Sequence, residues 1–259
     1  ENERAVAMGR NIETQTRSSI VGATIGFTLL GAMPLVAWKY TFGVYAVMSL
    51  AAMFVAFIRL PESLPKNPET YPGSWEVTPG IRRLLVVIFF TGFASALMQP
   101  IYLIYLQDKF DLPLQVLAWA FLPSAIIYAV LPSKLGKLGD RFGNVKVLAF
   151  GLSMVGIVYL CLPKLQYYVG FIIVYTVSSV GWAMFEPAKK SLISMQASEL
   201  NRGRVFGIAE LSAGIGASAG PIVGGYIYDQ SGASLTFYLT GMLMLGTAVL
   251  AMLLLSSKK

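Results

Sequence analysis

The chain has 259 residues, of which 56% are hydrophobic and only 13% are charged, and its formal net charge is +7. Soluble domains carry about 25% charged residues, so this composition, with a mean hydropathy of +0.65, excludes an ordinary soluble protein and indicates an integral membrane protein. The chain has no histidine and a single cysteine, Cys161, which disfavours metal, redox and acid–base sites, and we expect no cofactor.

Eight apolar runs follow one another along the chain, each near the roughly 20 residues that a membrane-spanning helix needs. A helix satisfies its own backbone hydrogen bonds in lipid, so we predict an all-α membrane fold with eight transmembrane helices. The opening residues, Glu1 to Arg4, do not start like a signal peptide and are typical of a loop inside a longer protein. The eight runs are residues 13–38, 42–58, 84–106, 114–131, 147–162, 167–184, 205–228 and 235–255.

The basic residues predict an orientation. With residue 1 on the inner side, the outer segments contain only Lys39, Lys109 and Lys164 of the 20 lysines and arginines. Inner loops of membrane proteins are enriched in these residues. We therefore predict a multi-pass protein of the cell membrane with both termini cytoplasmic. The excess of basic residues is explained by the membrane orientation that they set, so we expect no nucleic-acid partner.

Residues 59–83 form the longest segment between apolar runs and contain five prolines with mixed charges. Proline at this density opposes helix formation, so the segment is interpreted as an extended cytoplasmic linker. It divides the chain into residues 1–58, as the last two helices of an N-terminal bundle, the linker, and residues 84–259, as a six-helix C-terminal bundle.

An internal repeat supports this division. A shift of 198 positions places residues 4–9 on residues 202–207, and small residues recur at every fourth position in both copies. Such stripes let helices approach closely in lipid. The repeat unit has six helices, so the N-terminal unit lacks four, which a longer chain or a second polypeptide would supply. The matched stripes are Ser18, Gly22 and Gly26 in the first copy and Gly216, Gly220 and Gly224 in the second.

A short charged segment, residues 135–146, joins the fourth run to the fifth. Glycines at positions 136, 139 and 143 predict a backbone turn too tight for branched residues. Asp140 and Arg141 place opposite charges where the chain leaves the lipid. The segment is therefore interpreted as a loop that contacts can hold or release, as a gate requires.

These features resemble the Major Facilitator Superfamily of secondary transporters, which has six-helix units in tandem and a charged linker between them. The family pattern Gly-x-Leu-small-Asp-Arg-x-Gly is met from Gly136 to Gly143, with Asn144 where a second base is usual. A glycine-proline motif includes Pro221 and Gly225, and Glu186-Pro187-Ala188 followed by Asn201-Arg202-Gly203 resembles the loop before it.

The resemblance implies that the chain corresponds to helices five to twelve of a twelve-helix transporter, most like the drug-efflux and proton-coupled branches. Ala23 stands where the antiporter form of the glycine-proline motif has a proline. The resemblance also implies a gating role for Gly136, Asp140, Arg141 and Gly143. A carboxylate can lie against the positive N-terminal end of a helix, and we expect Asp140 to lie against the first helix near residues 10–13 while the inner side is closed.

Two polar faces are candidates for a substrate cavity. Residues spaced by three or four share one face of a helix, and the resemblance makes the helices of both faces cavity-lining. The alternative is that these side chains only join helices to one another. The first face contains Thr91, Ser95, Gln99 and Tyr102, and the second contains Tyr175, Ser179, Trp182 and Glu186.

Three acids lie near helix ends, where an ionisable group is a candidate functional residue. Glu13 has Arg10 and Arg17 within one turn, which favours an ordinary pairing at the membrane surface. Glu186 and Glu210 are candidates for coupling or gating.

The sequence thus predicts a transporter that moves a small solute by alternating access, with the lipid bilayer and a small-molecule substrate as partners. The resemblance favours protons as the coupling ion, in either export or uptake. Two alternatives remain open: a facilitator without ion coupling, and a membrane receptor or scaffold that keeps the fold but transports nothing. No nucleophile and base stand at usable spacing, so an enzyme is not predicted.

Overall fold

The computed structural model describes residues 3–32, 37–59, 77–99, 101–112, 116–117, 119–198 and 201–256. Most of the predicted linker, residues 59–83, lies outside these ranges. The chain forms two compact units, one of residues 1–14 and 75–259 and the other of residues 15–74. One boundary between them falls inside the first helix, α1 (Arg4–Ala32), and the other, between residues 74 and 75, falls within the predicted linker.

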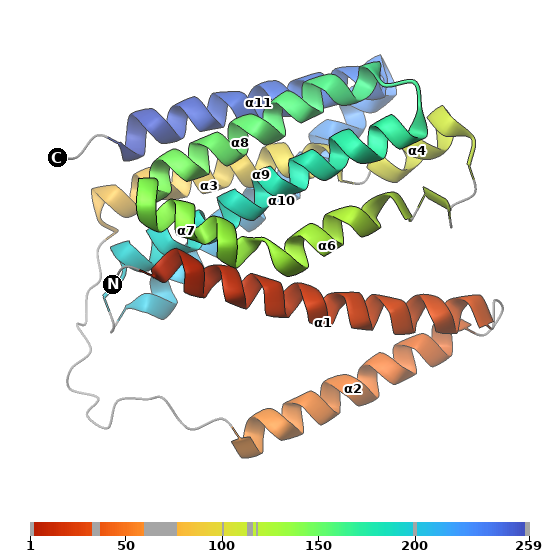
Figure 1. The fold of residues 1–259 in the computed structure, drawn as a ribbon, viewed down its shortest axis with the longest axis horizontal. Coiled ribbons are helices and arrows are strands. Elements are labelled where there is room, and N and C mark those ends of the chain that lie inside the picture. Colours follow the sequence, from red (N-terminus) through yellow and green to blue (C-terminus); the bar gives the residue numbers. More distant parts are fainter. Residues whose placement is uncertain are drawn as a thin grey trace. The chain divides into compact units, whose positions relative to one another are not determined.

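All regular elements in the described ranges are helices (Figure 1), which confirms the predicted all-α class. Six are long and apolar enough to cross a membrane. The predicted spans at 13–38, 84–106 and 114–131 each include residues outside the described ranges. After α1, the elements are α2 (Ala37–Arg59), α3 (Pro79–Met98), α4 (Ile101–Phe110), η2 (Trp119–Phe121), α6 (Leu122–Val130), α7 (Pro132–Phe142), α8 (Asn144–Cys161), η3 (Leu162–Lys164), α9 (Tyr168–Gln196), α10 (Arg202–Ser231) and α11 (Ala233–Leu255).

The segment 135–146 is helical, and its interpretation as a loop was wrong. It comprises most of α7 and the start of α8, and the chain changes direction only at Gly143, which has φ = +96°. A left-handed backbone conformation of this kind favours glycine. Gly136 and Gly139 lie inside α7, so they serve a purpose other than turning the chain.

Glycines allow helices of the larger unit to touch at backbone level. A Cβ atom at Gly151 of α8 would lie 2.5 Å from the Gly181 carbonyl oxygen of α9. One at Gly156 of α8 would lie 2.8 Å from the Gly241 carbonyl oxygen of α11. These separations leave no room for a side chain, so the crossings depend on glycine at both partners.

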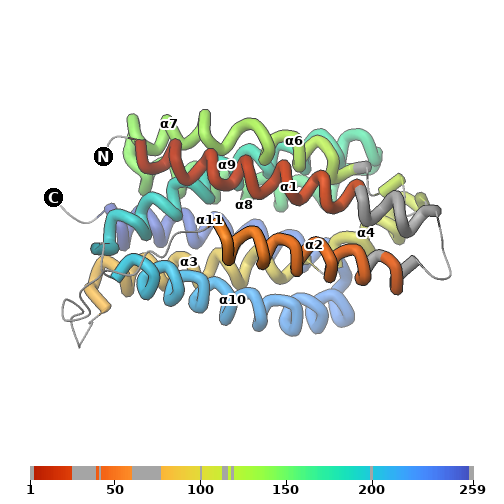
Figure 2. The backbone as a smooth tube through the Cα atoms, turned by 90° about the horizontal axis from the view of Figure 1, so that it is seen from below, coloured from red at the N-terminus to blue at the C-terminus, as the bar shows by residue number. Residues whose placement is uncertain are grey.

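The pair α3 and α10 uses the predicted small-residue stripe, and the two helices lie side by side along their lengths (Figure 2). Gly216, Gly220 and Gly224 of α10 all meet the backbone of α3. Close approach of this kind stabilises helix pairs in lipid through van der Waals contact. This packing holds α3 and α10 together as one pair. Part of the first predicted polar face lies on α3.

Candidate functional site

The first turns of α1 cross α7 at two glycines within the larger unit. A Cβ atom at Gly9 would lie 2.5 Å from the Pro132 carbonyl oxygen, and one at Gly136 would lie 2.5 Å from the Ala5 carbonyl oxygen. Any side chain would therefore separate the two helices. This contact, rather than a tight turn, is what Gly136 provides.

At this crossing each helix places a carboxylate at the N-terminus of the other. Asp140 accepts hydrogen bonds from the Ala5 and Val6 amides at 3.2 and 3.3 Å. Glu13 accepts one from the Ser133 amide at 2.8 Å. The first amides of a helix have no partner within it and carry partial positive charge, so both contacts are charge-assisted. We call the crossing with these contacts the reciprocal latch.

The reciprocal latch has a simple spacing pattern in the sequence, which was not among the predicted features. Ala5, Gly9 and Glu13 are spaced by four, as are Pro132, Gly136 and Asp140. Four-residue spacing keeps each set on one helix face, so each face presents a glycine followed one turn later by an acid.

One expectation about this region needs correction. Asp140 does lie against α1, but at its first turn rather than near residues 10–13. The pairing of Glu13 with arginines of its own helix stays a prediction, and the structure adds that Glu13 is only 7% exposed and lies at the start of α7. The sequence alone does not show this burial, because it depends on the packing of α1 against α7.

The other predicted gate residues lie around the latch. The Arg141 side chain is exposed, with its guanidinium carbon 5.2 Å from the centre of the Phe142 ring. Asn144, in place of a second base, donates through Nδ2 to Ser191 Oγ at 3.0 Å and ties α8 to α9. A pocket of about 520 Å³ opens beside Asp140 and is also lined by Arg4, Asn144, Lys146, Ser191 and Ser256.

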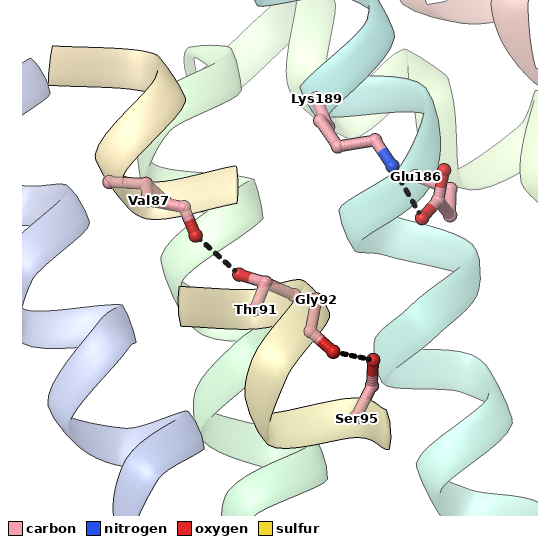
Figure 3. A network of polar contacts seen from close by, with 6 residues as sticks. All are labelled: Val87, Thr91, Gly92, Ser95, Glu186 and Lys189. Atoms are coloured by element: carbon pink, nitrogen blue, oxygen red, sulfur yellow. Dashed lines mark hydrogen bonds and ion pairs between the residues drawn. The ribbon is translucent and has the colours of Figure 1, made fainter. Parts of the chain in front are cut away.

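The first predicted polar face does not form one open surface. The Thr91 hydroxyl is buried and donates to the Val87 carbonyl, and the Ser95 hydroxyl donates to the Gly92 carbonyl, so both bond within α3 (Figure 3). Gln99, at the end of α3, is exposed. Its neighbour Pro100 lies outside the described residues.

Tyr102 belongs to α4 and lies in a buried aromatic cluster. Its ring centre is 5.1 Å from that of Tyr175 and 5.7 Å from those of Phe171 and Phe237. The structure therefore brings together one residue from each predicted face. Tyr102 is 7% exposed, and its hydroxyl has no hydrogen-bond partner among the described residues.

The remaining residues of the second face lie along α9. Ser179 is buried, while Trp182 is half-buried and packs edge-on against Phe185 at 5.4 Å. Glu186 is paired with Lys189 one turn away, with Oε1 2.8 Å from Nζ (Figure 3). The pairing cancels the charge of Glu186.

Glu210 differs from Glu186 because its side chain is exposed on α10.

Of the other predicted packing residues, Pro221 is half-buried inside α10, and a Cβ atom at Gly225 would have nothing within 4 Å. In the smaller unit Ser18 is exposed, and a Cβ atom at Gly22 would likewise meet nothing within 4 Å. The surroundings of Gly26 lie outside the described part of the chain.

Comparison with known proteins identifies relatives for this arrangement. Residues 84–259 match the family model described as Major Facilitator Superfamily. The chain is 26% identical over 248 residues to multidrug resistance protein MdtG of Proteus mirabilis, which covers 90% of this chain and 60% of that protein. It is 23% identical over 255 residues to multidrug resistance protein 1 of Bacillus subtilis, covering 95% of this chain and 64% of that protein.

A further relative is the lysophospholipid transporter LplT of Photorhabdus laumondii, which is 30% identical over 183 residues, or 68% of this chain and 42% of that protein. The chain thus spans less than two thirds of the length of each of these three relatives.

Proposed function

Because the chain belongs to the Major Facilitator Superfamily, we propose that it takes part in carrying a small organic solute across a bilayer by alternating access. In such a cycle two helix bundles rock about a central site that opens to one side at a time. The reciprocal latch is the observation that carries this proposal. It joins α1, from the predicted N-terminal bundle, to α7, from the predicted C-terminal bundle, through contacts that can break and re-form.

We place the reciprocal latch on the cytoplasmic side, where the basic loop residues also lie. Asp140 and Glu13 must leave the amides of the opposite helix before the bundles can separate on that side. The latch therefore favours the conformation that is closed toward the cytoplasm. A charge at a helix terminus contributes about 0.3–1 kcal/mol, and up to about 2 kcal/mol when partly buried, so two such contacts bias the equilibrium without locking it.

For the solute, we propose a drug-like organic compound that is exported. Two of the relatives are multidrug resistance proteins by name. Tyr175, which is half-buried beside the buried Tyr102, would supply an aromatic contact with a polar edge, which suits varied organic ligands. The exposed Gln99 side chain at the end of α3 would then orient such a compound by hydrogen bonds.

Replacing Gln99 by Ala tests whether this side chain binds the solute. Gln99 is exposed at the end of α3, so its amide is available to a solute without being required for packing. A lost neutral hydrogen bond costs about 0.5–1.5 kcal/mol, and we expect apparent solute affinity to fall about threefold to tenfold at unchanged protein yield. The control is Gln107→Ala, which removes an exposed glutamine from α4. Equal affinity of both variants in a solute-binding titration would contradict the assignment.

Glu210 is our stronger candidate for proton coupling, since Lys189 already neutralises Glu186. We expect Glu210→Gln to abolish the acceleration of flux by a pH gradient while exchange of solute without a gradient continues. Glu186→Gln leaves Lys189 without its carboxylate partner in a half-buried position, which lowers stability, but should keep the response to pH. Glu3→Gln is the control for loss of one exposed carboxylate. A Glu210→Gln protein that still responds to the gradient would remove this role.

The function itself is tested by flux into proteoliposomes that contain the complete protein. A panel of organic compounds is offered with and without a pH gradient. We expect solute-specific flux above that of protein-free vesicles, increased by the gradient. Flux that is the same with and without the pH gradient would indicate a facilitator. Binding without flux would indicate a receptor or scaffold and would refute transport.

A further inference from the structure

Glu186 and Lys189 form an ion pair well inside α9 rather than at its end. Glu186 lies ten residues before the last residue of the helix, Gln196, which is about 15 Å along the helix axis. The helix around the pair is apolar enough to cross a membrane. Charges at such a position are costly and are candidate functional groups, so this pair differs from an ordinary contact between residues three apart on a helix surface.

The Lys189 ammonium has two partners on α9, and they differ in kind. Its Nζ is 2.8 Å from Glu186 Oε1 and 5.3 Å from the centre of the Phe185 ring. A carboxylate and the face of an aromatic ring are two groups by which proteins recognise ammonium ions. The Lys189 side chain is only 12% exposed, so most of it fills space beside these two groups instead of extending into solvent.

The carboxylate has binding capacity that Lys189 does not use. The Glu186 side chain is 24% exposed, against 12% for Lys189, and its second oxygen, Oε2, has no hydrogen-bond partner among the described residues. Trp182 precedes Glu186 by four residues and lies on the same helix face, where it packs edge-on against Phe185. An aromatic surface thus adjoins the ion pair along the second predicted polar face.

We propose that these groups form a subsite for the ammonium group of a primary amine, and that Lys189 occupies this subsite until such a solute displaces it. The subsite rests on the proposed function and narrows the solute class to aromatic compounds that carry a compact, hydrogen-bearing ammonium group. A site that fits a lysine ammonium offers a hydrogen-bond acceptor, Glu186 Oε1, and the Phe185 ring face. A quaternary ammonium has no N–H to donate and should not replace Lys189.

The displacement is expected to be reversible, because a tethered ligand competes as if it were present at a fixed local concentration. When the solute ammonium binds Glu186, the flexible four-carbon stem of Lys189 lets its own ammonium move toward water. Neither charge is then buried without a partner, so the exchange avoids the cost of an unpaired ion. Lys189 thus stabilises the subsite while no solute is bound.

Binding titrations on the complete, detergent-solubilised protein test the subsite without requiring transport. The probes are phenethylamine, its trimethylammonium analogue and phenethyl alcohol, which share the aromatic ring and differ in the polar group. In the unaltered protein we expect phenethylamine to bind more tightly than both of the others. Equal affinity for phenethylamine and phenethyl alcohol would overturn the proposal.

Lys189→Met removes the tethered ammonium and keeps an unbranched side chain. We expect it to tighten phenethylamine binding about tenfold, since a charge-assisted hydrogen bond no longer has to be replaced, and to leave phenethyl alcohol binding unchanged. Lys189→Arg keeps a cation beside Glu186 and should leave phenethylamine affinity within about twofold of the unaltered value. The control is Lys190→Met, which removes the same charge one residue along, on a different face of α9.

Three results for Lys189→Met would overturn the proposal. Tighter binding of both phenethylamine and phenethyl alcohol would show only a gain of space. An effect equal to that of Lys190→Met would show only a change in net charge. A gain for the trimethylammonium analogue as large as that for phenethylamine would show that the site does not select hydrogen-bearing ammonium groups.

The double variant Glu186→Gln/Lys189→Met keeps the proposal testable even if Lys189→Met does not fold. It removes both charges together, which is often neutral for stability. We expect it to bind phenethylamine and phenethyl alcohol equally, because the carboxylate that distinguishes them is gone. A double variant that still prefers phenethylamine would refute the subsite.

Flux measurements separate the outcome for the subsite from the outcome for the proposed function. Preferential binding of phenethylamine without flux of any solute would leave the subsite standing and refute transport. Flux of organic solutes by a protein that shows no preference for phenethylamine would refute the subsite alone.

Discussion

Asp140→Asn should shift the transporter toward the conformation that is open to the cytoplasm. Asparagine can still accept a hydrogen bond from the Ala5 or Val6 amide, but it lacks the charge that interacts with the positive end of α1. The loss is about 1 kcal/mol, which corresponds to about a fivefold change in the ratio of the two conformations. The measurement is the labelling rate, by a membrane-impermeant thiol reagent, of single cysteines placed on the inner and outer sides.

Glu13→Gln should shift the labelling in the same direction, because it weakens the equivalent contact to Ser133 from the other helix. Asp229→Asn is the matched control, since this exposed acid near the end of α10 takes no part in the crossing. If Asp140→Asn and Glu13→Gln leave labelling on both sides as it is in the unaltered protein, the reciprocal latch does not control access.

The second large effect is expected on folding, from Gly151→Val. The added Cβ would meet the Gly181 carbonyl oxygen at 2.5 Å, and a backbone atom cannot turn aside as a flexible side chain can. The helices α8 and α9 would have to separate along their crossing, at a cost of about 3 kcal/mol. We expect a clear drop in folded protein, measured by unfolding in detergent with increasing denaturant.

Gly246→Val provides the control for this prediction. It makes the same substitution inside α11, at a position where nothing lies within 4 Å of the added Cβ. It therefore keeps the change in helix propensity but not the collision. Equal unfolding midpoints for the two variants would show that the crossing of α8 and α9 tolerates a side chain.

The class of fold could be predicted because each membrane-spanning helix must meet the requirements of the bilayer by itself. Length and hydropathy of a run are enough to identify a spanning helix, and six such helices are found in the described ranges. Family membership could also be predicted, from the pattern between Gly136 and Gly143. The predicted domain division and the site roles remain predictions, since contacts alone do not establish them.

The contacts of the candidate site could not be predicted from the sequence, because they depend on which helices pack against each other. Glycine spacing at 136 and 139 suits both a turn and a helix crossing, and only the position of Ala5 beside Gly136 decides between them. The arc assumed for Thr91 to Tyr102 stays a prediction, because it spans the end of α3 at Met98 and the start of α4 at Ile101, and Pro100 lies outside the described residues. The burial of Glu13 likewise depends on α7, which is far away in the sequence.

The glycine crossings between α8, α9 and α11 have a thermodynamic consequence. Helices that separate inside a bilayer exchange contacts with each other for contacts with lipid chains, and they expose little new surface to water. The hydration that gives soluble proteins a large heat capacity of unfolding is then mostly missing. The free energy that holds this bundle together should therefore vary almost linearly with temperature, without the loss of stability on cooling that soluble domains show.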